Sequence, residues 1–352
     1  MACQQRRALL ILPDRLLSMG KVLVIRFSSI GDVLLTTPVV RQLARNNEVH
    51  VLTKAAYASL FIGNPHVSKV LRLEKGNSLP ALANRVRSES YTAVYDLHRS
   101  WRSIGLRLLS GHWFSPTYRK GNWGKIWMVK RPRMLSWPKA DQYLTKHVVD
   151  RYRATVKAAA DDEGLDISPE SIDIQLPADY NVLVVGAKQF TKRIPLESLK
   201  QIAQRSEFPV VLLGGPDDKA EAESVMSGLP ESKTINLAGS LSLRQSAGVL
   251  AGARRIVCPD TGMMHVATAL QKPVAVLWGS TTPEFGFAPF YGGNGLAEIE
   301  AKRREAGALS CSVELPCRPC TRTGFDACPQ GHFRCMKNQD LNRVISWLNQ
   351  PS

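Results

Sequence analysis

The sequence predicts an α/β protein made of two consecutive units, each an open parallel sheet with helices between its strands. Three observations lead to this prediction. The chain has 352 residues, which is long enough for two domains of ordinary size. Short apolar runs alternate with helical segments, as in βαβ crossovers. This alternation stops at an acidic, proline-containing segment near residues 161–180 and then starts again.

The first unit opens with KVLVIRF at residues 21–27, a continuous apolar run typical of a strand that is buried on both faces. A helical pattern follows at 33–45. The same reasoning predicts further strands at 48–53, 70–73 and 93–98, and a helix at 81–89. Ligands of such folds bind at the carboxyl ends of the strands.

The second unit restarts the pattern with NVLVVGA at residues 181–187. Its predicted strands continue at 209–215, 234–239, 255–260 and 273–279, and its predicted helices lie at 196–204, 263–270 and 341–348. We expect two such units to face each other across a cleft. The expected division is an N-terminal extension at 1–20, a first domain at 21–165, a second domain at 176–340 with a cysteine-rich segment at 311–335, and a closing C-terminal helix at 341–352.

The charge balance favours an anionic partner, because the formal net charge is +16 and the pI is near 9.7. The stretch from Arg99 to Lys139 holds ten Lys or Arg residues, no Asp or Glu, and five of the seven tryptophans. One interpretation is a solvated basic face with packing aromatics, and the other is a surface for a large, amphipathic, negatively charged ligand. No apolar run approaches the roughly 20 residues that span a bilayer, and we expect no signal peptide.

A small-residue turn with one carboxylate follows the first strand. The sequence IRFSSIGD places Gly31 and Asp32 where the strand ends and a helix begins. Glycine allows a close backbone approach to a ligand. Asp32 has two interpretations: a first-turn carboxylate that stabilises the helix by about 1 kcal/mol, or a catalytic carboxylate that faces the cleft.

The second unit carries a phosphate-binding pattern. In CPDTGMMHVATAL, the strand ends at Cys258, Asp260-Thr261-Gly262 makes a turn, and a helix begins. Backbone N–H groups at a helix N-terminus favour phosphate, and His265 lies one turn into the helix. The alternative is simple turn chemistry with a surface histidine. Cations at 188–193 and a carboxylate at Asp217, after the GG of VVLLGG, extend the pattern toward a diphosphate and a ribose.

Several common motifs are missing from the sequence. It contains no GxxxxGK[ST] loop and no GxGxxG fingerprint, so the usual NTPase and NAD-binding signatures are lacking. It contains no GxSxG, the commonest α/β-hydrolase signature.

Six segments, in their order along the chain, resemble the heptosyltransferases of lipopolysaccharide core assembly, glycosyltransferase family 9. They are KVLVIRFSSIGDVLLTTPVVRQL, YDLHRSWRSIGLRLL, HVVDRYR, TKRIPLESL, LLGGPDD and PDTGMMHVATALQKPVAVLWGSTTP. The resemblance covers roughly residues 20–348. It implies a GT-B architecture of two Rossmann-like domains, the first binding the acceptor and the second the nucleotide-sugar. It also implies an inverting transfer of heptose from an ADP-activated donor to a lipid A–Kdo type acceptor, with no cofactor required.

The resemblance also implies roles for individual residues. Asp32 becomes the general base that deprotonates the acceptor hydroxyl. The implied donor and nucleotide site consists of Lys192, Asp217, Asp260, Thr261, Gly262 and His265. The implied acceptor contacts are Arg102, His147 and Arg151. The basic, tryptophan-rich stretch would suit an anionic glycolipid at the cytoplasmic surface of the inner membrane, so we expect a cytoplasmic protein that is peripheral to that membrane.

Five cysteines cluster near the C-terminus in the pattern C-x5-C-x2-C-x7-C-x6-C. A structural zinc could use Cys317, Cys320, Cys328 and Cys335, with His332 as an alternate ligand. The alternative is a set of reduced cysteines in a compact loop, since only one tight CxxC pair is present.

Three other functions compete with the leading hypothesis. A related glycosyltransferase could use another nucleotide-sugar. A GT-B-like protein could bind a nucleotide-sugar without catalysis, although Asp32 argues against this. A basic nucleic-acid-binding protein is a third class, but the positive region has no RRM, helix-turn-helix or zinc-finger signature, so we expect no nucleic-acid partner.

Overall fold

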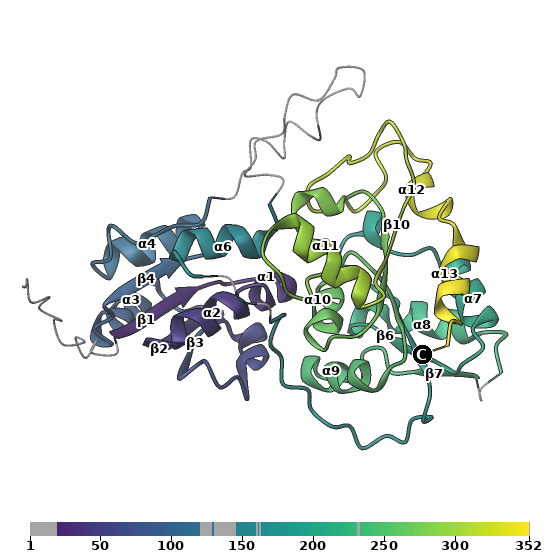
Figure 1. The fold of residues 1–352 in the computed structure, drawn as a ribbon, viewed down its shortest axis with the longest axis horizontal. Coiled ribbons are helices and arrows are strands. Elements are labelled where there is room, and N and C mark those ends of the chain that lie inside the picture. The colour runs from purple at the N-terminus through teal and green to yellow at the C-terminus, as the bar shows by residue number, and fades with distance from the viewer. Residues whose placement is uncertain are drawn as a thin grey trace, which may run out of the picture.

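The computed structural model describes residues 20–119, 129, 146–159, 161, 163–230 and 233–351. These residues form two parallel sheets with helices around them, arranged side by side (Figure 1). The two-unit α/β prediction is therefore confirmed. Residues 1–19 of the predicted extension, and residues 120–128 and 130–139 of the basic stretch, lie outside the described part of the chain.

The first sheet has the strand order β3-β2-β1-β4. Its strands are β1 (Gly20–Ile25), β2 (Asn47–Lys54), β3 (Lys69–Leu73) and β4 (Ala93–Asp96). All neighbours pair in parallel, and Ile25 at the end of β1 lies opposite Asp96 at the end of β4. The helices α3 (Leu79–Ser88) and α4 (Trp101–Leu109) flank this sheet. The loops that follow β1 and β4 consequently leave the same sheet edge.

The predicted helix at 33–45 is two helices in the structure, α1 (Ile30–Leu34) and α2 (Thr37–Ala44). The break has a local cause, because Pro38 has no N–H to continue the first helix and suits the first turn of a new one. A one-turn helix is thus left directly after β1. It carries Gly31 and Asp32.

The second sheet has the order β10-β9-β8-β5-β6-β7. Its strands are β5 (Asn181–Val184), β6 (Val210–Leu213), β7 (Thr234–Asn236), β8 (Ile256–Pro259), β9 (Val274–Trp278) and β10 (Leu309–Ser312). Every residue of β5, β6, β8 and β9 is buried, as expected of apolar runs in a parallel sheet. The edge strand β10 was not predicted, because LSCS is short and partly polar.

The helices of this second domain are α7 (Leu196–Arg205), α8 (Lys219–Met226), α9 (Leu243–Gly252), α10 (Gly262–Ala269), α11 (Gly295–Glu305), α12 (Arg334–Lys337) and α13 (Leu341–Leu348). The closing helix α13 packs against α7 of this domain. Its Trp347 indole N–H donates to the Gly307 carbonyl at 2.9 Å. In the part of the chain described, no helix is long and apolar enough to cross a membrane.

The acidic linker is bound at both ends. On α2, the Arg41 guanidinium pairs with Asp161 at 3.0 Å and with Asp166 at 2.6 Å. Farther along, Arg244 on α9 pairs with Glu170 at 3.2 Å and donates to the Ser168 carbonyl at 3.0 Å. One half of the linker is therefore fixed to the first domain and the other half to the second.

The two domains touch through the helices that follow β1 and β8. A Cβ atom on Gly262 of α10 would lie 2.6 Å from the Cβ of Ile30, and one on Gly31 of α1 would overlap the His265 ring. Only glycine at both positions permits this approach. Figure 1 shows α1 at the end of the first domain that meets α10. The strand ends of both sheets therefore converge on one cleft.

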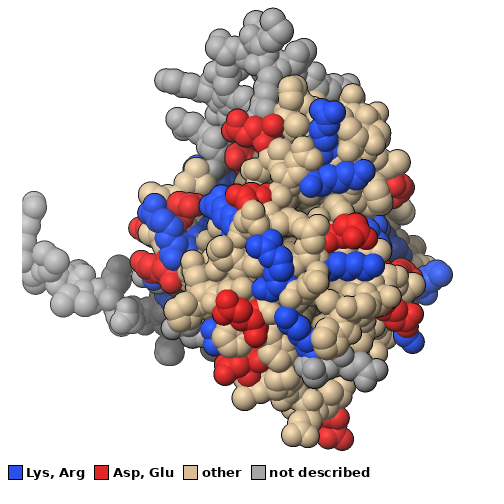
Figure 2. Space-filling view, turned by 90° about the vertical axis from the view of Figure 1, so that its right-hand side faces the viewer, with Lys and Arg blue, Asp and Glu red and all other residues tan. Residues whose placement is uncertain are grey.

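Figure 2 shows the side of the molecule that lies at the right in Figure 1, where α7 and α13 of the second domain are found. Lys and Arg side chains are interspersed with Asp and Glu side chains on this face. The basic side chains on this face do not form one continuous basic patch, which a nucleic-acid-binding surface would require.

Candidate active site

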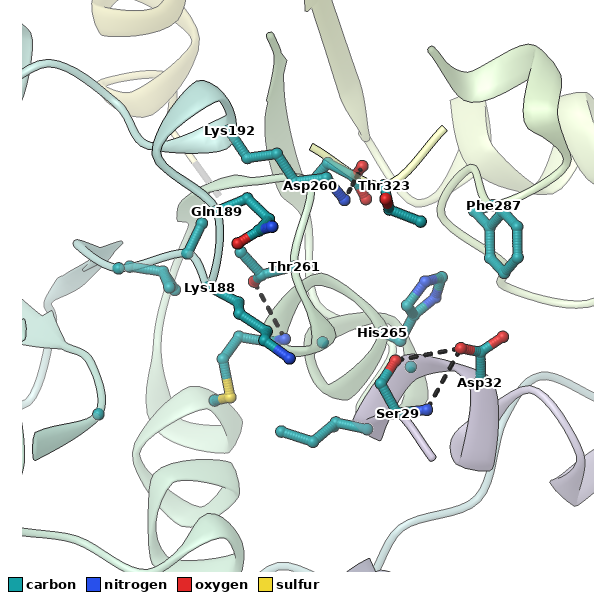
Figure 3. Close-up of a pocket in the computed structure, with 18 of the residues that line it drawn as sticks. Ser29, Asp32, Lys188, Gln189, Lys192, Asp260, Thr261, His265, Phe287 and Thr323 are labelled. Atoms are coloured by element: carbon teal, nitrogen blue, oxygen red, sulfur yellow. Dashed lines mark hydrogen bonds and ion pairs between the residues drawn. The ribbon is translucent and has the colours of Figure 1, made fainter. Parts of the chain in front are cut away.

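A pocket of about 860 Å³ lies where the two domains meet. Its walls come from the loop after β1 and α1, from the loops after β5 and β6, and from the start of α10. Figure 3 shows the side chains that face this space. The structure brings six predicted site residues to it: Asp32, Lys192, Asp260, Thr261, Gly262 and His265.

Asp32 is held by partners on both carboxylate oxygens. Its Oδ1 lies 2.5 Å from an Nη of Arg26. Its Oδ2 accepts from the Ser29 hydroxyl at 3.1 Å and from the Ser29 backbone N–H at 3.3 Å. Burial pushes the pKa of Asp32 upward, but the charge and hydrogen bonds of Arg26, helped by Ser29, bring that pKa below its ordinary value. The carboxylate is therefore ionised and fixed in direction at neutral pH.

Arg26 was not predicted as a site residue. It is the last charged group before the turn, is only 6% exposed, and donates from its other Nη to the Leu97 carbonyl at 2.6 Å. Its guanidinium also lies 5.8 Å from the centre of the Tyr152 ring. A charged residue inside an apolar strand run is costly to bury without a partner. A charged residue in the apolar segment IRF was therefore the sequence signal that could have identified Arg26 as a site residue.

The second wall is the N-terminus of α10. Thr261 is the N-cap residue, and its hydroxyl accepts from the Met263 N–H at 3.2 Å. The first N–H groups of a helix have no partner inside the helix, so they present partial positive charge to the pocket. Nearby, the Lys192 ammonium lies 2.6 Å from Asp260, which also accepts from the Thr281 hydroxyl at 2.7 Å. This wall can hold a phosphate group.

His265 lies between the two walls in Figure 3. It is 4% exposed, and among the described residues its Nδ1 has no hydrogen-bond partner. Burial lowers its pKa to about 4, although the carboxylates of Asp260 and Asp32 act in the opposite direction. The ring is therefore neutral at pH 7.

The nucleoside contact predicted for Asp217 stays a prediction, and it is the neighbouring carboxylate that lines the pocket. Asp217 is exposed and does not line the pocket, whereas its neighbour Asp218 does. Asp218 accepts from the Gly215 N–H at 2.8 Å and pairs with Arg193 at 3.0 Å. The short 3-10 turn after β6 explains why Asp218 and not Asp217 lines the pocket, because the turn directs the third residue of PDD back to the strand ends.

Two predicted acceptor residues are buried in the contact between the domains. The helix α6 (Val148–Val156) begins after His147, whose Nε2 donates to the Ala288 carbonyl at 3.0 Å and whose Nδ1 accepts from the Val149 N–H at 3.2 Å. Arg151 is completely buried and donates to the Phe285 carbonyl at 2.7 Å. Neither side chain lines the pocket in this structure, and the acceptor role of both residues stays a prediction. These residues attach α6 to the second domain.

Arg102 lies on α4 and donates to the Asn77 carbonyl at 3.0 Å, and it does not line the pocket. Its acceptor role stays a prediction.

The cysteine-rich segment forms part of the pocket. Arg322 and Thr323 line it, a contribution that no sequence pattern indicated. Thr191 attaches the segment to the cationic loop, because its hydroxyl accepts from the Phe325 N–H at 2.8 Å and from the Ser280 hydroxyl at 2.9 Å. The segment therefore sits over the residues that precede Lys192.

The predicted zinc ligands carry free thiols. The Cys317 sulfur lies 3.8 Å from the Nε2 of His332, and burial raises the pKa of the Cys335 thiol to about 11. Within the described ranges, no group of three or more His, Cys, Asp or Glu side chains is arranged to hold a metal ion. The zinc site stays a prediction.

The sequence profile of glycosyltransferase family 9 (heptosyltransferase) matches residues 79–292, more than half of the chain. The chain is 26% identical over 335 residues to lipopolysaccharide heptosyltransferase 1 of Pseudomonas aeruginosa PAO1, a match that spans 86% of both proteins.

Among solved structures, the fold is similar to that of Escherichia coli ADP-heptose LPS heptosyltransferase II, with a TM-score of 0.67 at 21% identity over 93% of this chain and 98% of the other. It is also similar to E. coli heptosyltransferase WaaC with ADP, with a TM-score of 0.55 at 20% identity over 77% and 93% of the two chains. These likenesses confirm the predicted GT-B arrangement of two Rossmann-like domains.

Proposed function

Because the chain belongs to glycosyltransferase family 9, the family of the heptosyltransferases, we propose that its pocket transfers a heptose from an ADP-activated donor to the inner core of lipopolysaccharide. The protein is a glycosyltransferase. The observation that carries the proposed mechanism is that an ionised carboxylate, Asp32, and a helix N-terminus, that of α10, line one pocket from different domains. A reaction with a nucleophilic hydroxyl and a diphosphate leaving group needs both.

The reaction that we propose is a single displacement with inversion at the anomeric carbon. An acceptor hydroxyl attacks this carbon and its proton passes to Asp32, while the bond between the sugar and the diphosphate breaks and ADP leaves with the electron pair. Arg26 and Ser29 keep the carboxylate ionised and aimed, since they occupy its two oxygens from one side. Base catalysis of this kind contributes typically 10²–10⁴-fold in rate.

The leaving diphosphate gains negative charge in the transition state. The N–H groups at the start of α10 stabilise this charge, and Lys192 adds a mobile cation. Lys192 pairs with Asp260 in the structure, so we expect its ammonium to turn from this carboxylate to the diphosphate when the donor binds. We propose that these groups of the chain supply the positive charge at the reacting centre, and that no cofactor is required.

The neutral ring of His265 lines the pocket and can bind a sugar or phosphate oxygen. On the nucleoside side, Gly214, Gly215 and Asp218 line the pocket at the end of β6. A carboxylate at this place can accept from ribose hydroxyls. These positions fit a nucleotide-sugar that extends from β6 to α10.

We also propose that the enzyme works as a peripheral protein at the cytoplasmic surface of the inner membrane. Trp101 is 80% exposed, Trp113 is 65% exposed and Phe114 is fully exposed, all in the basic stretch of the first domain. Exposed aromatic side chains among arginines suit the interface of an anionic membrane.

The test is a donor panel. Wild-type protein is incubated with ADP-heptose, and separately with UDP- and GDP-sugars, together with a lipid A–Kdo acceptor. We expect transfer from ADP-heptose with an inverted anomeric configuration in the product. Transfer from another nucleotide-sugar alone would favour the related-enzyme alternative, and nucleic-acid binding without any transfer would favour the non-enzymatic one.

The base is tested by Asp32→Asn, which keeps the shape but removes the proton acceptor. We expect kcat to fall by roughly 10²–10⁴-fold while ADP binding persists. Asp217→Asn is the matched control, because Asp217 is exposed and lies outside the pocket. Wild-type-like turnover by Asp32→Asn would refute the assignment of the base.

A further inference from the structure

A second pocket, of about 390 Å³, lies in the first domain beside the site described above. Its lining consists of Arg99, Ile104, Arg107, Thr117 and Arg119. We propose that this arginine pocket binds a phosphate monoester group carried by the lipid-linked acceptor. The proposal rests on the proposed function and extends it, because it assigns the acceptor a second point of attachment.

A buried carboxylate organises the arginine pocket. Asp96, the last residue of β4, is completely buried. Its Oδ1 accepts from the backbone N–H of His98 at 3.0 Å and of Arg99 at 2.8 Å, and its Oδ2 lies 3.2 Å from the Nε of Arg107. Arg99 has a φ of 47°, a left-handed conformation that is rare for a residue with a side chain. The turn after β4 is thus built around Asp96.

The charge of the arginine pocket fits a dianion. Three guanidinium groups line the pocket and the carboxylate of Asp96 pairs with that of Arg107, so the formal charge of these four side chains is +2. Guanidinium groups bind phosphate oxygens through paired, charge-assisted hydrogen bonds. Thr117 also lines the pocket, and its hydroxyl donates to the Ser115 carbonyl at 3.0 Å. A phosphate monoester near neutral pH carries close to two negative charges, which this set would neutralise.

The arginine pocket adjoins the active site through two consecutive residues. Thr117 lines the arginine pocket, and Tyr118 lines the larger pocket that holds Asp32. Both are fixed to the end of β4, because the Tyr118 N–H donates to the Asp96 carbonyl at 2.9 Å. One acceptor molecule can therefore place a phosphate among the arginines and a hydroxyl near Asp32.

An apolar strip beside the arginine pocket indicates that this phosphate belongs to an amphiphile. Ile104 lines the pocket. Trp101 lies three residues before Ile104 and Leu108 four residues after it, so all three lie on the same face of α4. These side chains are 37%, 80% and 42% exposed, respectively. A glycolipid presents a phosphorylated sugar and an apolar anchor together, whereas a free sugar phosphate offers nothing to this strip.

The experiment compares Arg99→Gln/Arg119→Gln with the control Arg45→Gln/Arg72→Gln. The control removes the same charge from exposed positions of the same domain that line neither pocket. Arg107 is kept, because its loss would leave Asp96 buried without a partner. The readout is the ratio of kcat/KM for a phosphorylated acceptor to that for the same acceptor treated with phosphatase. We expect this ratio to fall at least tenfold in the test pair and to stay near wild type in the control pair.

Further measurements separate the possible sources of phosphate. The ratio is measured in detergent micelles without vesicles, so that a change in membrane binding does not enter it, and inorganic phosphate should bind too weakly to inhibit. A ratio that stays at the wild-type value in the test pair would overturn the proposal. If no donor supports transfer, calorimetric titration with the phosphorylated and dephosphorylated acceptor still tests the arginine pocket. Equal affinity of the wild type for both acceptors would then refute it independently of catalysis.

Discussion

At the scale of single residues, the site depends on how one carboxylate is kept charged. Asp32 is only 21% exposed, and burial alone would raise its pKa. The Arg26 guanidinium reverses that effect from 2.5 Å away. A base whose pKa lies below its ordinary value gives up driving force for proton transfer but is ionised at every physiological pH. We infer that Arg26 positions the base and keeps it charged.

Replacing Arg26 should therefore move the pH dependence of the reaction. In Arg26→Gln, Asp32 keeps its burial but loses its cation, so its pKa rises. We expect the acidic limb of the kcat/KM profile to shift to higher pH by roughly one to three units. Arg26→Lys retains the charge and should leave the limb near its wild-type position. A uniform loss of activity at all pH values, with no shift of the limb, would indicate a merely structural role.

At the scale of secondary-structure elements, two helix starts meet at the reaction centre. The one-turn α1 and the eight-residue α10 approach each other through Gly31 and Gly262. The base belongs to one helix and the phosphate-binding N–H groups to the other. The spacing of these two helices therefore sets the distance between acceptor and donor, and displacements of about 1 Å can cost 10²-fold in rate.

Gly262→Ala tests this spacing. The added Cβ would lie 2.6 Å from the Cβ of Ile30, so α10 must move away from α1. We expect kcat to fall at least tenfold, with a loss in the free energy of unfolding of about 1–3 kcal/mol from overpacking. Steady-state kinetics and urea unfolding measure the two effects.

The double variant Ile30→Gly/Gly262→Ala supplies the control, because it removes the atoms that the new methyl group meets. It should recover activity relative to Gly262→Ala alone. If the single variant is fully active, the helix spacing does not limit the reaction.

At the scale of the whole molecule, the domains are joined by contacts far from the reacting groups. The helix α6 belongs to the first domain by its packing on α2, yet His147, Arg151 and Arg153 on and before it bind carbonyls of the second domain. The linker adds ion pairs to each side. The orientation of the two domains therefore depends on buried polar groups, which are sensitive to protonation.

The burial of His147 makes the free energy of unfolding dependent on pH. Burial lowers the pKa of His147 to about 3, against an unfolded value near 6.5, although its bond to Ala288 opposes the effect. Below pH 6.5 the unfolded chain binds a proton that the folded chain does not, so the free energy of unfolding falls as the pH falls. The expected slope is about 1.4 kcal/mol per pH unit from this residue, and His265 acts in the same direction.

Thermal unfolding at pH 7, 6 and 5 measures this effect in the wild type and in His147→Gln. The variant should show a smaller decrease in the unfolding midpoint between pH 7 and 5 than the wild type does. Equal decreases in the two proteins would show that His147 does not titrate in the unfolding transition.

The features of the fold that depend on local pattern could be predicted from the sequence alone. Apolar runs located nine of the ten strands found in the described part of the chain, and the restart after the acidic linker separated the two domains. Asp32 and the Asp260-Thr261-Gly262 turn were identifiable because each directly follows a buried strand, where a parallel sheet places its ligands. Pro38 shows the limit even here, because it divided a helix that the apolar pattern alone predicted as continuous.

Which polar groups meet could not be predicted from local pattern and became clear only from the packing of the elements. Packing accounts for four features of the site that the sequence did not indicate. Two of them are the pairing of Arg26 with Asp32 and the position of Asp218, rather than Asp217, in the pocket wall. The other two are the burial of His147 and Arg151 and the grouping of Arg99, Arg107 and Arg119. Periodicity indicates which face of an element is apolar, but the partner of a charged side chain depends on elements that lie far apart in the sequence. The physical reason is that burial and pairing act together, so a charged group keeps its charge in the interior only where the fold brings it a counter-charge.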